Sequence, residues 1–552
     1  MTDNRGEDIR FSNKDRATRI VQSRESVYDL IIIGGGITGA GIAIDAALRG
    51  LSTLLVEKVD FAAGTSSKST KLIHGGLRYL KQFEFGLVRE SGLERAVAHR
   101  NIPHLVHPEK MFLPIVKKGS FSKIAASMAV SVYDRLAKVT AADRKETFNR
   151  KESIELEPII NKDLIKSGVQ YSEYRTDDAR LTIELIKAAK RHNAEAFNYM
   201  QVNDFVYLDG KVKGVMCTDL ITGSQIDFKA TQVVSAAGPW VDKLREVNAS
   251  KEGKSLQLTK GVHIVVPREK VPVQSAVYFD AFDGRMLFAI PRGKVTYVGT
   301  SDTVYKEDLN RVLCTTADAD YILKAVNNMF EITTLQKEDI ISTWAGLRPL
   351  IHEDGKSPSE LSRKDEIFIS DTELISIAGG KLTGYRKMAK RIVDLVQEKN
   401  PSFSNKECAT ESFAIHADGF KDYKAFREYR KSLEKEFYSN GLTAFDAWYL
   451  STTYGRHATK IINDALAEKT DFSKALIKSE IAYCIEFESC YHPIDYFNRR
   501  TGKAYFDINS VKDNMELIIT EFQSHFGWDD NKTKEHMADS QTAIEDLTIL
   551  KA

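Results

Sequence analysis

The sequence predicts an α/β protein in which an antiparallel sheet interrupts a nucleotide-binding domain and a helical region follows. Three observations lead to this prediction. A strand, a glycine-rich turn, a helix and a second strand follow one another between Tyr28 and Lys58. Short β-like runs separated by turn residues occupy the stretch from Thr259 to Asp302. Beyond residue 400 the chain is charged and helix-periodic and contains no glycine motif.

The first unit reads YDLIIIGGGITGAGIAIDAALRGLSTLLVEK. Gly34 would permit the tight turn after the strand, Gly36 would let a pyrophosphate approach the backbone, and Gly39 would let the helix pack against the strand. The anion would lie at the helix N-terminus, where unpaired N–H groups and the helix dipole favour it. Glu57 ends the second strand, where it can accept hydrogen bonds from ribose hydroxyls and would repel a 2′-phosphate. We therefore predict a bound adenine dinucleotide other than NADP.

The remaining elements follow in chain order. Helical patterns dominate from about Glu109 to Pro158, and a second α/β stretch begins near Tyr171. Its helix ARLTIELIKAAKRH has Asp177 or Asp178 as a capping residue. A hairpin (VNDFVYLDGKVKGVMCTDLITGSQIDFKA), a strand (QVVSAAGPW) and a strand, glycine turn and helix (ELISIAGGKLTGYRKMAKRIVDLV) come later. The predicted domains are an extension (1–27), a discontinuous nucleotide-binding domain (28–110, 171–250 and 365–400), a substrate domain (111–170 and 251–364) and a helical domain (401–552).

Composition excludes several classes of protein. The 552 residues carry a net charge of +1, so neither a nucleic-acid binder nor an acidic solvating protein is indicated. Five scattered cysteines without a C-x-x-C pair indicate a reducing compartment. The N-terminus lacks the apolar region of a secretory signal, and the chain lacks a run of about 18 apolar residues, so we expect no transmembrane helix. A cytoplasmic protein is expected, and attachment to the inner face of the membrane stays open.

Three other patterns have less specific interpretations. His104 and His107 form an H-x-x-H pair, but no third ligand is evident, so no metal site is predicted. Cys484 and Cys490 lie in an apolar helical stretch and are expected in a core. The segment 111–138 (MFLPIVKKGSFSKIAASMAVSVYDRLAK) mixes apolar residues with lysines. It predicts either a helix that touches anionic lipid or a helix packed under the nucleotide-binding domain.

A polar segment, TSSKSTKLIHGGLRYL, follows the first unit. Ser66 and Ser67 could donate hydrogen bonds to phosphate or ribitol oxygens. His74 and the two glycines after it would allow a ligand ring to lie against the backbone, and Arg78 is a bidentate anion donor. The alternative is an ordinary polar loop with a satisfied histidine.

Three later segments strengthen the functional interpretation. TKGVHIVVP places His263 at a strand start, STWAGLRPLIHEDGKSPSELSR places Arg348 and Arg363 near turns, and IAGGKLTGYRKMAKR places Lys381 at a helix entry. Three arginines and a lysine in loops could form an anion site, although each arginine alone could be a surface residue. A positive group beside glycine N–H donors is also how flavoproteins stabilise charge near flavin N1 and the C2 carbonyl.

Together these motifs resemble the FAD-dependent glycerol-3-phosphate dehydrogenase family. The matching segments run in the family's order from Tyr28 to about Val396, and the C-terminal region resembles the family's cap domain more loosely. Small departures are Ser235 and Ala237 in SAAGPW and Ser301 in GTSD. None of them removes a charge or a glycine. The segments are IIIGGGITGAGIA, EKVDFAAGTSSKSTKLIHGGLRYL, EYRTDDARL, SAAGPWVD, TKGVHIVVP, AIPRGKVTYVGTSDT, WAGLRPLI, SRKDEI and IAGGKLTGYRKMA.

The resemblance implies a fold and a set of site residues. The fold would be an FAD-binding Rossmann-like domain of the glutathione-reductase and D-amino-acid-oxidase type, with an inserted antiparallel-sheet substrate domain and a C-terminal helical cap. Substrate would be bound by Arg78, Tyr79, His263, Arg348 and Arg363, and the catalytic residues would be His74, His263, Arg348 and Lys381. FAD would be bound, noncovalently, by Gly34, Gly36, Ile37, Thr38, Gly39, Glu57, Ser66, Ser67, Leu72, His74, Gly75, Val202, Ala237, Gly238, Gly379, Gly380, Lys381, Leu382 and Thr383.

The implied reaction oxidises glycerol 3-phosphate to dihydroxyacetone phosphate. Flavin N5 would accept the hydride from C2, and either His74 or His263 would take the hydroxyl proton. Membrane quinone is the expected electron acceptor, and oxygen is the alternative. Related oxidases that use oxygen carry an insertion between WAGLRPLI and SRKDEI, and this span is short here. An amine or amino-acid oxidase of the same fold is a further possibility, and so is a non-catalytic flavoprotein. Association with a membrane surface and a homodimer are also expected.

Overall fold

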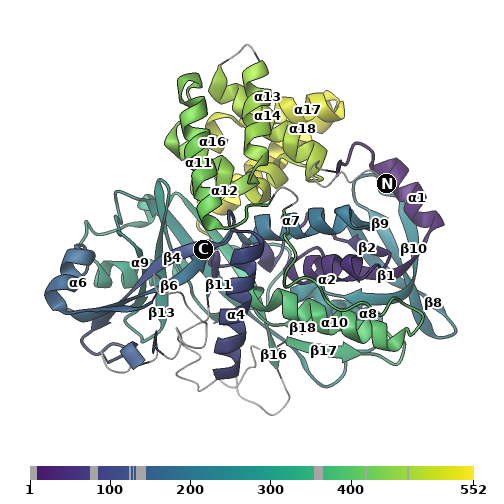
Figure 1. Ribbon diagram of the computed structural model, residues 1–552, viewed down its shortest axis with the longest axis horizontal. Coiled ribbons are helices and arrows are strands. Elements are labelled where there is room, and N and C mark those ends of the chain that lie inside the picture. The colour runs from purple at the N-terminus through teal and green to yellow at the C-terminus, as the bar shows by residue number, and fades with distance from the viewer. Residues whose placement is uncertain are drawn as a thin grey trace.

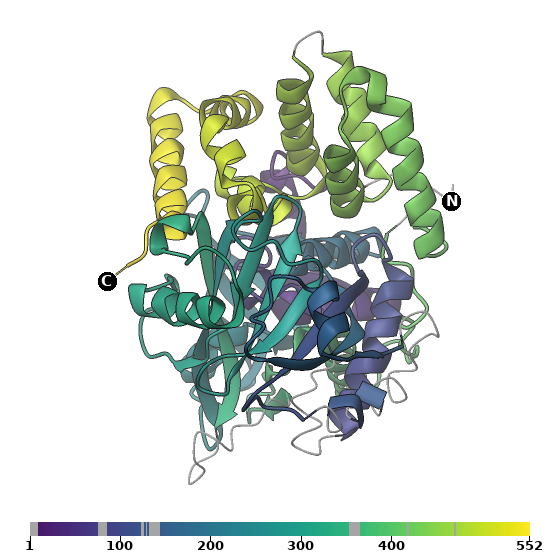
Figure 2. The same cartoon turned by 90° about the vertical axis from the view of Figure 1, so that its left-hand side faces the viewer.

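The computed structural model describes residues 9–74, 85–122, 126–128, 130–131, 144–352, 365–416, 419–468 and 471–551. Two β-sheets lie next to each other, and the helices of the C-terminal region lie above both of them (Figure 1). The view from the side shows the same helices above the sheets (Figure 2). This arrangement confirms the predicted fold class of an α/β domain with an inserted sheet and a helical C-terminal region.

The first sheet has the glycine-rich unit at its centre. β1 pairs in parallel with β10 and β2, and the parallel pairs β2–β7 and β10–β18 continue the sheet on both sides. The strands run in the order β17 (Asp365–Ile369), β18 (Ile375–Gly379), β10 (Gln225–Ser235), β1 (Val27–Ile33), β2 (Thr53–Val56) and β7 (Ala194–Phe197), and the antiparallel strands β9 (Lys211–Asp219) and β8 (Met200–Leu208) branch from β10.

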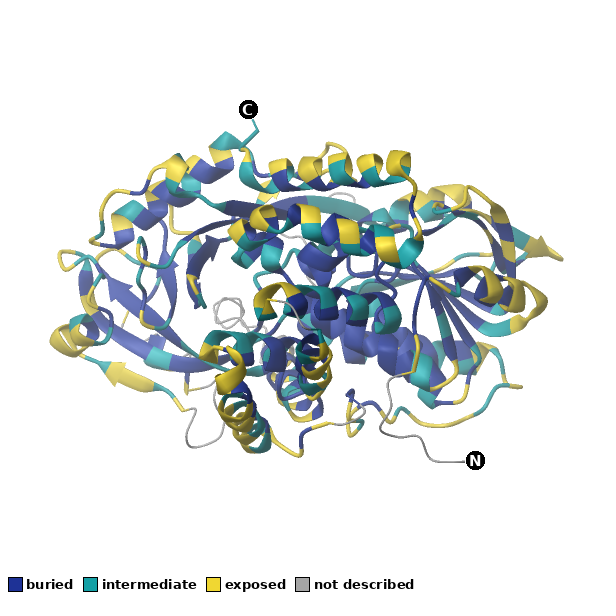
Figure 3. Ribbon diagram, turned by 90° about the horizontal axis from the view of Figure 1, so that it is seen from above, coloured by how far each residue is buried: buried dark blue, intermediate teal, exposed yellow. Residues whose placement is uncertain are grey.

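The side chains of β1 alternate between two cores because the period of a strand is two residues. Leu30 and Ile32 pack with the helices on one face of the sheet, and Ile31 and Ile33 pack with the β8–β9 hairpin on the other. The strands are buried while the outer helices keep one exposed side (Figure 3). The helices beside this sheet are α1 (Arg16–Glu25), α2 (Ile37–Leu48), α7 (Asp178–Arg191), α8 (Val241–Val247) and α10 (Tyr385–Lys399). Asp177 caps α7 by accepting a hydrogen bond from the N–H of Arg180, as predicted.

The second sheet is mainly antiparallel and carries its own core. Its strands run in the order β15 (Thr303–Val304), β11 (Ser255–Pro267), β14 (Val295–Gly299), β13 (Met286–Arg292), β12 (Ala276–Asp280), β4 (His107–Val116), β6 (Ile165–Arg175) and β3 (Leu72–Ile73), with β16 (Ser342–His352) paired to β11 and β5 (Glu146–Phe148) to β6. The helices α4 (Phe85–Asn101), α6 (Arg150–Leu156) and α9 (Thr316–Met329) accompany it.

The C-terminal region is helical, and Cys484 and Cys490 are fully buried in its core, as predicted. A π-helical turn, η8 (Asp495–Arg500), joins its two halves. Its helices are α11 (Tyr423–Phe437), α12 (Ala444–Tyr454), α13 (His457–Ala467), α14 (Phe472–Phe487), α15 (Lys503–Phe506), α16 (Ile508–Asp513), α17 (Met515–Phe526) and α18 (Asp530–Thr548).

The helical prediction for the start of 109–158 is wrong, because residues 109–116 belong to β4. β4 is a central strand between β12 and β6, and its residues 111–116 are buried on both faces because a core lies on each side of the sheet. Met111 and Leu113 enter one core and Phe112 enters another, and the apolar run therefore shows no alternation. Both helix hypotheses for 111–138 fail over this first part for the same reason. Residues 123–125, 129 and 132–138 lie outside the described ranges.

The N-terminal extension packs against the body of the protein from residue 9 onward. The backbone of Phe11 exchanges hydrogen bonds with Glu486 and Ser489. Arg16 forms a buried ion pair with Asp219 at 3.0 Å. In the described ranges, no helix combines the length and the apolar character needed to cross a bilayer.

Candidate active site

A cavity of about 1110 Å³ lies between the two sheets and reaches the C-terminal helices. Its volume is slightly above the roughly 300–1,000 Å³ of most small-molecule sites, so it has room for a dinucleotide and a small substrate. The predicted residues that line it are Gly34, Gly36, Ile37, Thr38, Glu57, Ser66, Ser67, Leu72, His74, Val202, Ala237, Gly238, His263, Arg348, Gly379, Gly380, Lys381, Leu382 and Thr383.

The glycine loop forms one part of the lining. Gly34 has a φ of 111°, and a Cβ there would lie 2.6 Å from the carbonyl oxygen of Ala236. A Cβ at Gly39 would lie 1.9 Å from the carbonyl oxygen of Gly34, so this glycine brings α2 against the loop without lining the cavity. Ser66 Oγ accepts a hydrogen bond from the N–H of Ile37 at 2.9 Å. Gly36, Ile37 and Thr38 line the cavity, so it meets the N-terminus of α2, which suits an anion.

Glu57 lies at the end of β2 and supports the same loop. Its Oε2 accepts a hydrogen bond from the N–H of Gly35 at 2.7 Å, and its Oε1 accepts one from the N–H of Val59 at 3.0 Å. Burial raises the pKa of this carboxyl, and the two backbone hydrogen bonds oppose that rise. Each carboxylate oxygen has a second lone pair, which a ribose hydroxyl could use.

His263 and Arg348 lie on neighbouring strands of the second sheet, β11 and β16. The prediction that Arg348 lies near a turn is wrong, because it is inside β16 and pairs with Thr259 of β11. The His263 ring stacks on Trp344 with centroids 4.6 Å apart, and its Nε2 lies 3.0 Å from Thr70 Oγ1. Burial, and then the positive charge of Arg348, hold the pKa of His263 well below its ordinary value. The imidazole is therefore neutral at neutral pH.

Arg348 is held by three oxygens that follow β14. Its Nη2 donates to Thr300 Oγ1 at 2.8 Å, and its Nη1 donates to the carbonyl oxygen of Ser301 at 3.1 Å and to Asp302 Oδ1 at 3.2 Å. The guanidinium group lies against Gly261, where a Cβ would be 2.4 Å from Nη2. A planar group with several donors is therefore held at the cavity wall in one orientation.

Lys381 lies at the entry to a short turn, η6 (Leu382–Gly384), that leads into α10. Gly379 and Gly380 precede it with φ values of 78° and 76°. The backbone thus turns sharply after β18, and the lysine and the helix entry line the cavity together. His74 is half-buried and meets Phe288 edge-on, with ring centroids 5.6 Å apart.

Four predicted residues, Gly75, Arg78, Tyr79 and Arg363, lie outside the described ranges. Other lining residues were not predicted as site residues. Thr300 and Asp302 follow a strand end in GTSDT, and this position could have identified them. Arg285 follows the Asp283-Gly284 turn and lines the cavity as well. The residues of η8 and α18 that line the cavity belong to no sequence motif that could have identified them as site residues.

Comparisons with known proteins agree with this geometry. Residues 29–369 match the family model described as FAD dependent oxidoreductase, and residues 370–533 match the C-terminal domain of alpha-glycerophosphate oxidase. An aerobic glycerol-3-phosphate dehydrogenase of Bacillus subtilis (strain 168) is 46% identical over 98% of both chains. One from Staphylococcus haemolyticus is 44% identical over 97% of both chains.

A solved structure has the same architecture over nearly the whole chain. The glycerol-3-phosphate dehydrogenase from Bacillus halodurans, complexed with FAD, is 40% identical and has a TM-score of 0.84, and the match covers 98% of this chain and 99% of that one. An L-alpha-glycerophosphate oxidase from Mycoplasma pneumoniae with FAD bound is 18% identical, with a TM-score of 0.53 over 69% of this chain and 98% of that one. The latter likeness shows the fold alone.

Proposed function

The chain belongs to the family of FAD-dependent oxidoreductases, and we infer that it oxidises sn-glycerol 3-phosphate to dihydroxyacetone phosphate as an aerobic glycerol-3-phosphate dehydrogenase. The observation that carries this inference is the 46% identity to a dehydrogenase of that name over 98% of both chains. The cavity supports it, because Arg348 supplies a fixed anion donor on the same sheet as a buried neutral histidine, His263. An arginine could bind the carboxylate of an amino acid as well as a phosphate, so the identity to dehydrogenases, and not the arginine, is what favours this function over an amino-acid oxidase of the same fold.

The residues around the cavity fit FAD. Backbone N–H groups at the start of α2, the backbone of Gly36 at the cavity wall and the carboxylate of Glu57 suit a pyrophosphate and a ribose. Ser66, Ser67 and the segment Gly379–Thr383 would hold the ribitol and the flavin ring. When bound, FAD supplies a two-electron acceptor that takes the hydride from C2 of the substrate.

The residues of the chain then have four tasks: to bind the phosphate, orient C2, remove one proton and stabilise charge. Arg348 would bind the phosphate, and binding at this remote group would fix the position of C2. The alcohol loses a hydride from C2 and a proton from its hydroxyl, which leaves a ketone. A neutral imidazole can accept that proton, and His263 and His74 both remain candidates. Lys381 would supply positive charge beside the flavin ring.

Several finer points belong to the same proposal. Arg78, Tyr79 and Arg363 would complete the substrate site. Membrane quinone would reoxidise the cofactor at the inner face of the cell membrane, where the protein would associate with the surface, and a homodimer would form. The short span between Arg348 and Arg363 supports quinone over oxygen, since the related oxidases carry an insertion there.

One anaerobic experiment tests the central proposal. The purified protein should show a flavin absorption band that glycerol 3-phosphate bleaches rapidly, and a quinone should restore the band faster than oxygen does. A yellow protein that no small alcohol phosphate bleaches would favour a non-catalytic flavoprotein. A faster return of the band with oxygen, together with peroxide, would favour an oxidase.

A further inference from the structure

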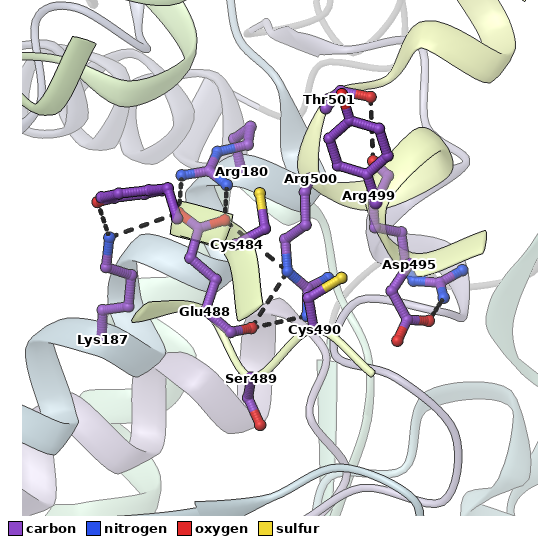
Figure 4. Close-up of polar contacts among 12 residues, drawn as sticks. Arg180, Lys187, Cys484, Glu488, Ser489, Cys490, Asp495, Arg499, Arg500 and Thr501 are labelled. Atoms are coloured by element: carbon purple, nitrogen blue, oxygen red, sulfur yellow. Dashed lines mark hydrogen bonds and ion pairs between the residues drawn. The ribbon is translucent and has the colours of Figure 1, made fainter. Parts of the chain in front are cut away.

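Two consecutive arginines connect the C-terminal region to the nucleotide-binding domain. Arg499 and Arg500 end the π-helical turn η8, in which the N–H of Thr501 donates to the carbonyl oxygen of Tyr496, five residues earlier, at 3.0 Å. π-Helical turns are rare in proteins, and those that occur often lie at functional sites. Figure 4 shows Arg500 beside Glu488 and Arg499 beside Asp495, and both arginine side chains are buried. Asn498 and Arg499 also line the cavity.

Both arginines bind one carboxylate, that of Asp60. Arg499 Nε donates to Asp60 Oδ2 at 2.5 Å, and Arg500 Nη1 and Nη2 donate to Oδ2 and Oδ1 at 2.7 and 2.9 Å. Asn198 Nδ2 donates to Oδ1 at 2.9 Å. Asp60 and Arg500 have no exposed surface, so these charge-assisted bonds are shielded from water. Arg499 and Arg500 keep the pKa of the Asp60 carboxyl below its ordinary range despite its burial.

Asp60 belongs to the loop 57–62, which supports the glycine loop directly. At one end of it, Glu57 Oε2 accepts a hydrogen bond from the N–H of Gly35 at 2.7 Å. At the other end, the N–H of Ala62 donates to the carbonyl oxygen of Gly35 at 3.0 Å. Between them, Phe61 packs so closely that a Cβ on Gly35 would lie 2.7 Å from its ring. A continuous series of contacts therefore leads from Arg499 and Arg500 to the backbone beside Gly36.

We propose that Arg499 and Arg500 are positioning residues for the cofactor: through Asp60 they hold the loop 57–62 so that Glu57 and the glycine loop fit the adenosine half of FAD. The C-terminal region then helps to shape the FAD site, in addition to its expected role as a cap domain over the substrate. This inference depends on FAD binding and is independent of which alcohol the protein oxidises.

A second buried ion pair, between Arg180 and Glu488, joins the nucleotide-binding domain to the C-terminal region and provides a matched control. Arg180 of α7 donates to Glu488 Oε2 and Oε1 from its Nη1 and Nη2, at 2.6 and 2.7 Å (Figure 4). This pair is as buried as the pair at Asp60. It joins α7 to the end of α14. Glu488 Oε2 also lies 3.8 Å from Arg500 Nε, and Arg500 donates hydrogen bonds to the Glu488 carbonyl oxygen, which a change of the Glu488 side chain leaves in place. The hydrogen bonds of the Glu488 carboxylate go to Arg180 and Lys187, and none of them reaches the loop 57–62.

The test compares Asp60→Asn with Glu488→Gln in the full-length holoenzyme. Each variant turns one buried carboxylate into an amide of similar shape, so both should lower the unfolding temperature. Only Asp60→Asn should release FAD faster, by about tenfold, a common size for coupling between linked sites. Release is followed by the rise in flavin fluorescence at a temperature where the protein stays folded.

Equal release rates in the two variants, or a rate for Asp60→Asn within twofold of the parent protein, would overturn the proposal. If Asp60→Asn does not fold, Arg500→Lys decides the question, because it keeps the charge and removes the bidentate contact. It should release FAD faster than Glu488→Gln does, and an equal rate would again contradict the proposal. Failure of glycerol 3-phosphate to bleach the flavin would leave these release rates unaffected and would contradict only the proposed function.

Discussion

A methyl group added at Gly36 should have a different effect from one added at Gly39, although the two glycines are only three residues apart. At Gly39 the new Cβ would lie 1.9 Å from the carbonyl oxygen of Gly34, a backbone atom that cannot turn away. At Gly36 the nearest atom is Ser66 Oγ at 3.1 Å, and the φ of −80° suits any residue. Gly39→Ala therefore damages the protein itself, while Gly36→Ala requires only a small shift of the Ser66 side chain and narrows the space for the ligand.

The expected magnitudes follow from these distances. The overlap at Gly39 requires α2 to move by more than about 1 Å, and overpacking of this kind costs about 1–3 kcal/mol. At Gly36 the methyl group would occupy space that the pyrophosphate needs. If the same 1–3 kcal/mol is lost from the free energy of FAD binding, FAD binds roughly 5- to 150-fold more weakly. The larger side chain of Gly36→Val should give protein without flavin.

The assay separates stability from binding. Flavin is removed from each variant, thermal unfolding of the flavin-free protein is recorded, and FAD is then titrated back while the quenching of its fluorescence is followed. Gly36→Ala should unfold like the parent protein and bind FAD weakly, whereas Gly39→Ala should unfold at a lower temperature. Parent-like FAD affinity in Gly36→Ala would refute the placement of the pyrophosphate at this glycine.

Three further predictions concern single side chains. Arg348→Ala should lose most turnover of glycerol 3-phosphate and keep its FAD, because it removes the anion donor; parent-like kinetics would exclude Arg348 from the substrate site. Asp302→Ala should raise KM severalfold and lower kcat less, because it frees a half-exposed guanidinium; steady-state rates with glycerol, which has no phosphate, should not change. Burial raises the pKa of Glu157 to about 7, so its stabilising contribution is lost as the pH rises from below its unfolded value through 7. Glu157→Gln should therefore raise the unfolding temperature at pH 8 and leave it nearly unchanged at pH 5, and an equal gain at both pH values would contradict this.

The part of the fold that the sequence predicts is the part that local patterns determine. The strand, glycine loop and helix at Gly34 follow from spacing within one short segment, and so does the cap of α7 at Asp177. β4 was missed because a strand buried on both faces has no alternation, and a short apolar run of this kind fits a helix equally well. The error reflects the cores that cover both faces of β4, which no local pattern contains.

The candidate site divides in the same way. His263 and Arg348 could each be singled out from a separate motif, but their place on neighbouring strands could not be predicted, because the segment around Arg348 indicates a turn and the residue lies inside β16. The sequence could indicate only some of the oxygens that hold Arg348. Thr300 and the guanidinium of Arg348 meet beside Gly261, which leaves room for both because it has no side chain. The roles of these residues in binding and catalysis stay predictions.

The clamp on Asp60 could not be predicted, because its partners are 439 and 440 residues away along the chain. In a sequence, two adjacent arginines most simply indicate a solvated surface, since arginine is rarely buried unless it is paired. Their burial becomes intelligible only with Asp60 in place, and Asp60 in turn has a reason to be buried only because it belongs to the loop beside Gly35. A buried charge of this kind is costly to keep without its partners. Its presence next to the glycine loop is therefore better explained by a need to hold that loop than by a need to join two domains, which apolar side chains would do at lower cost.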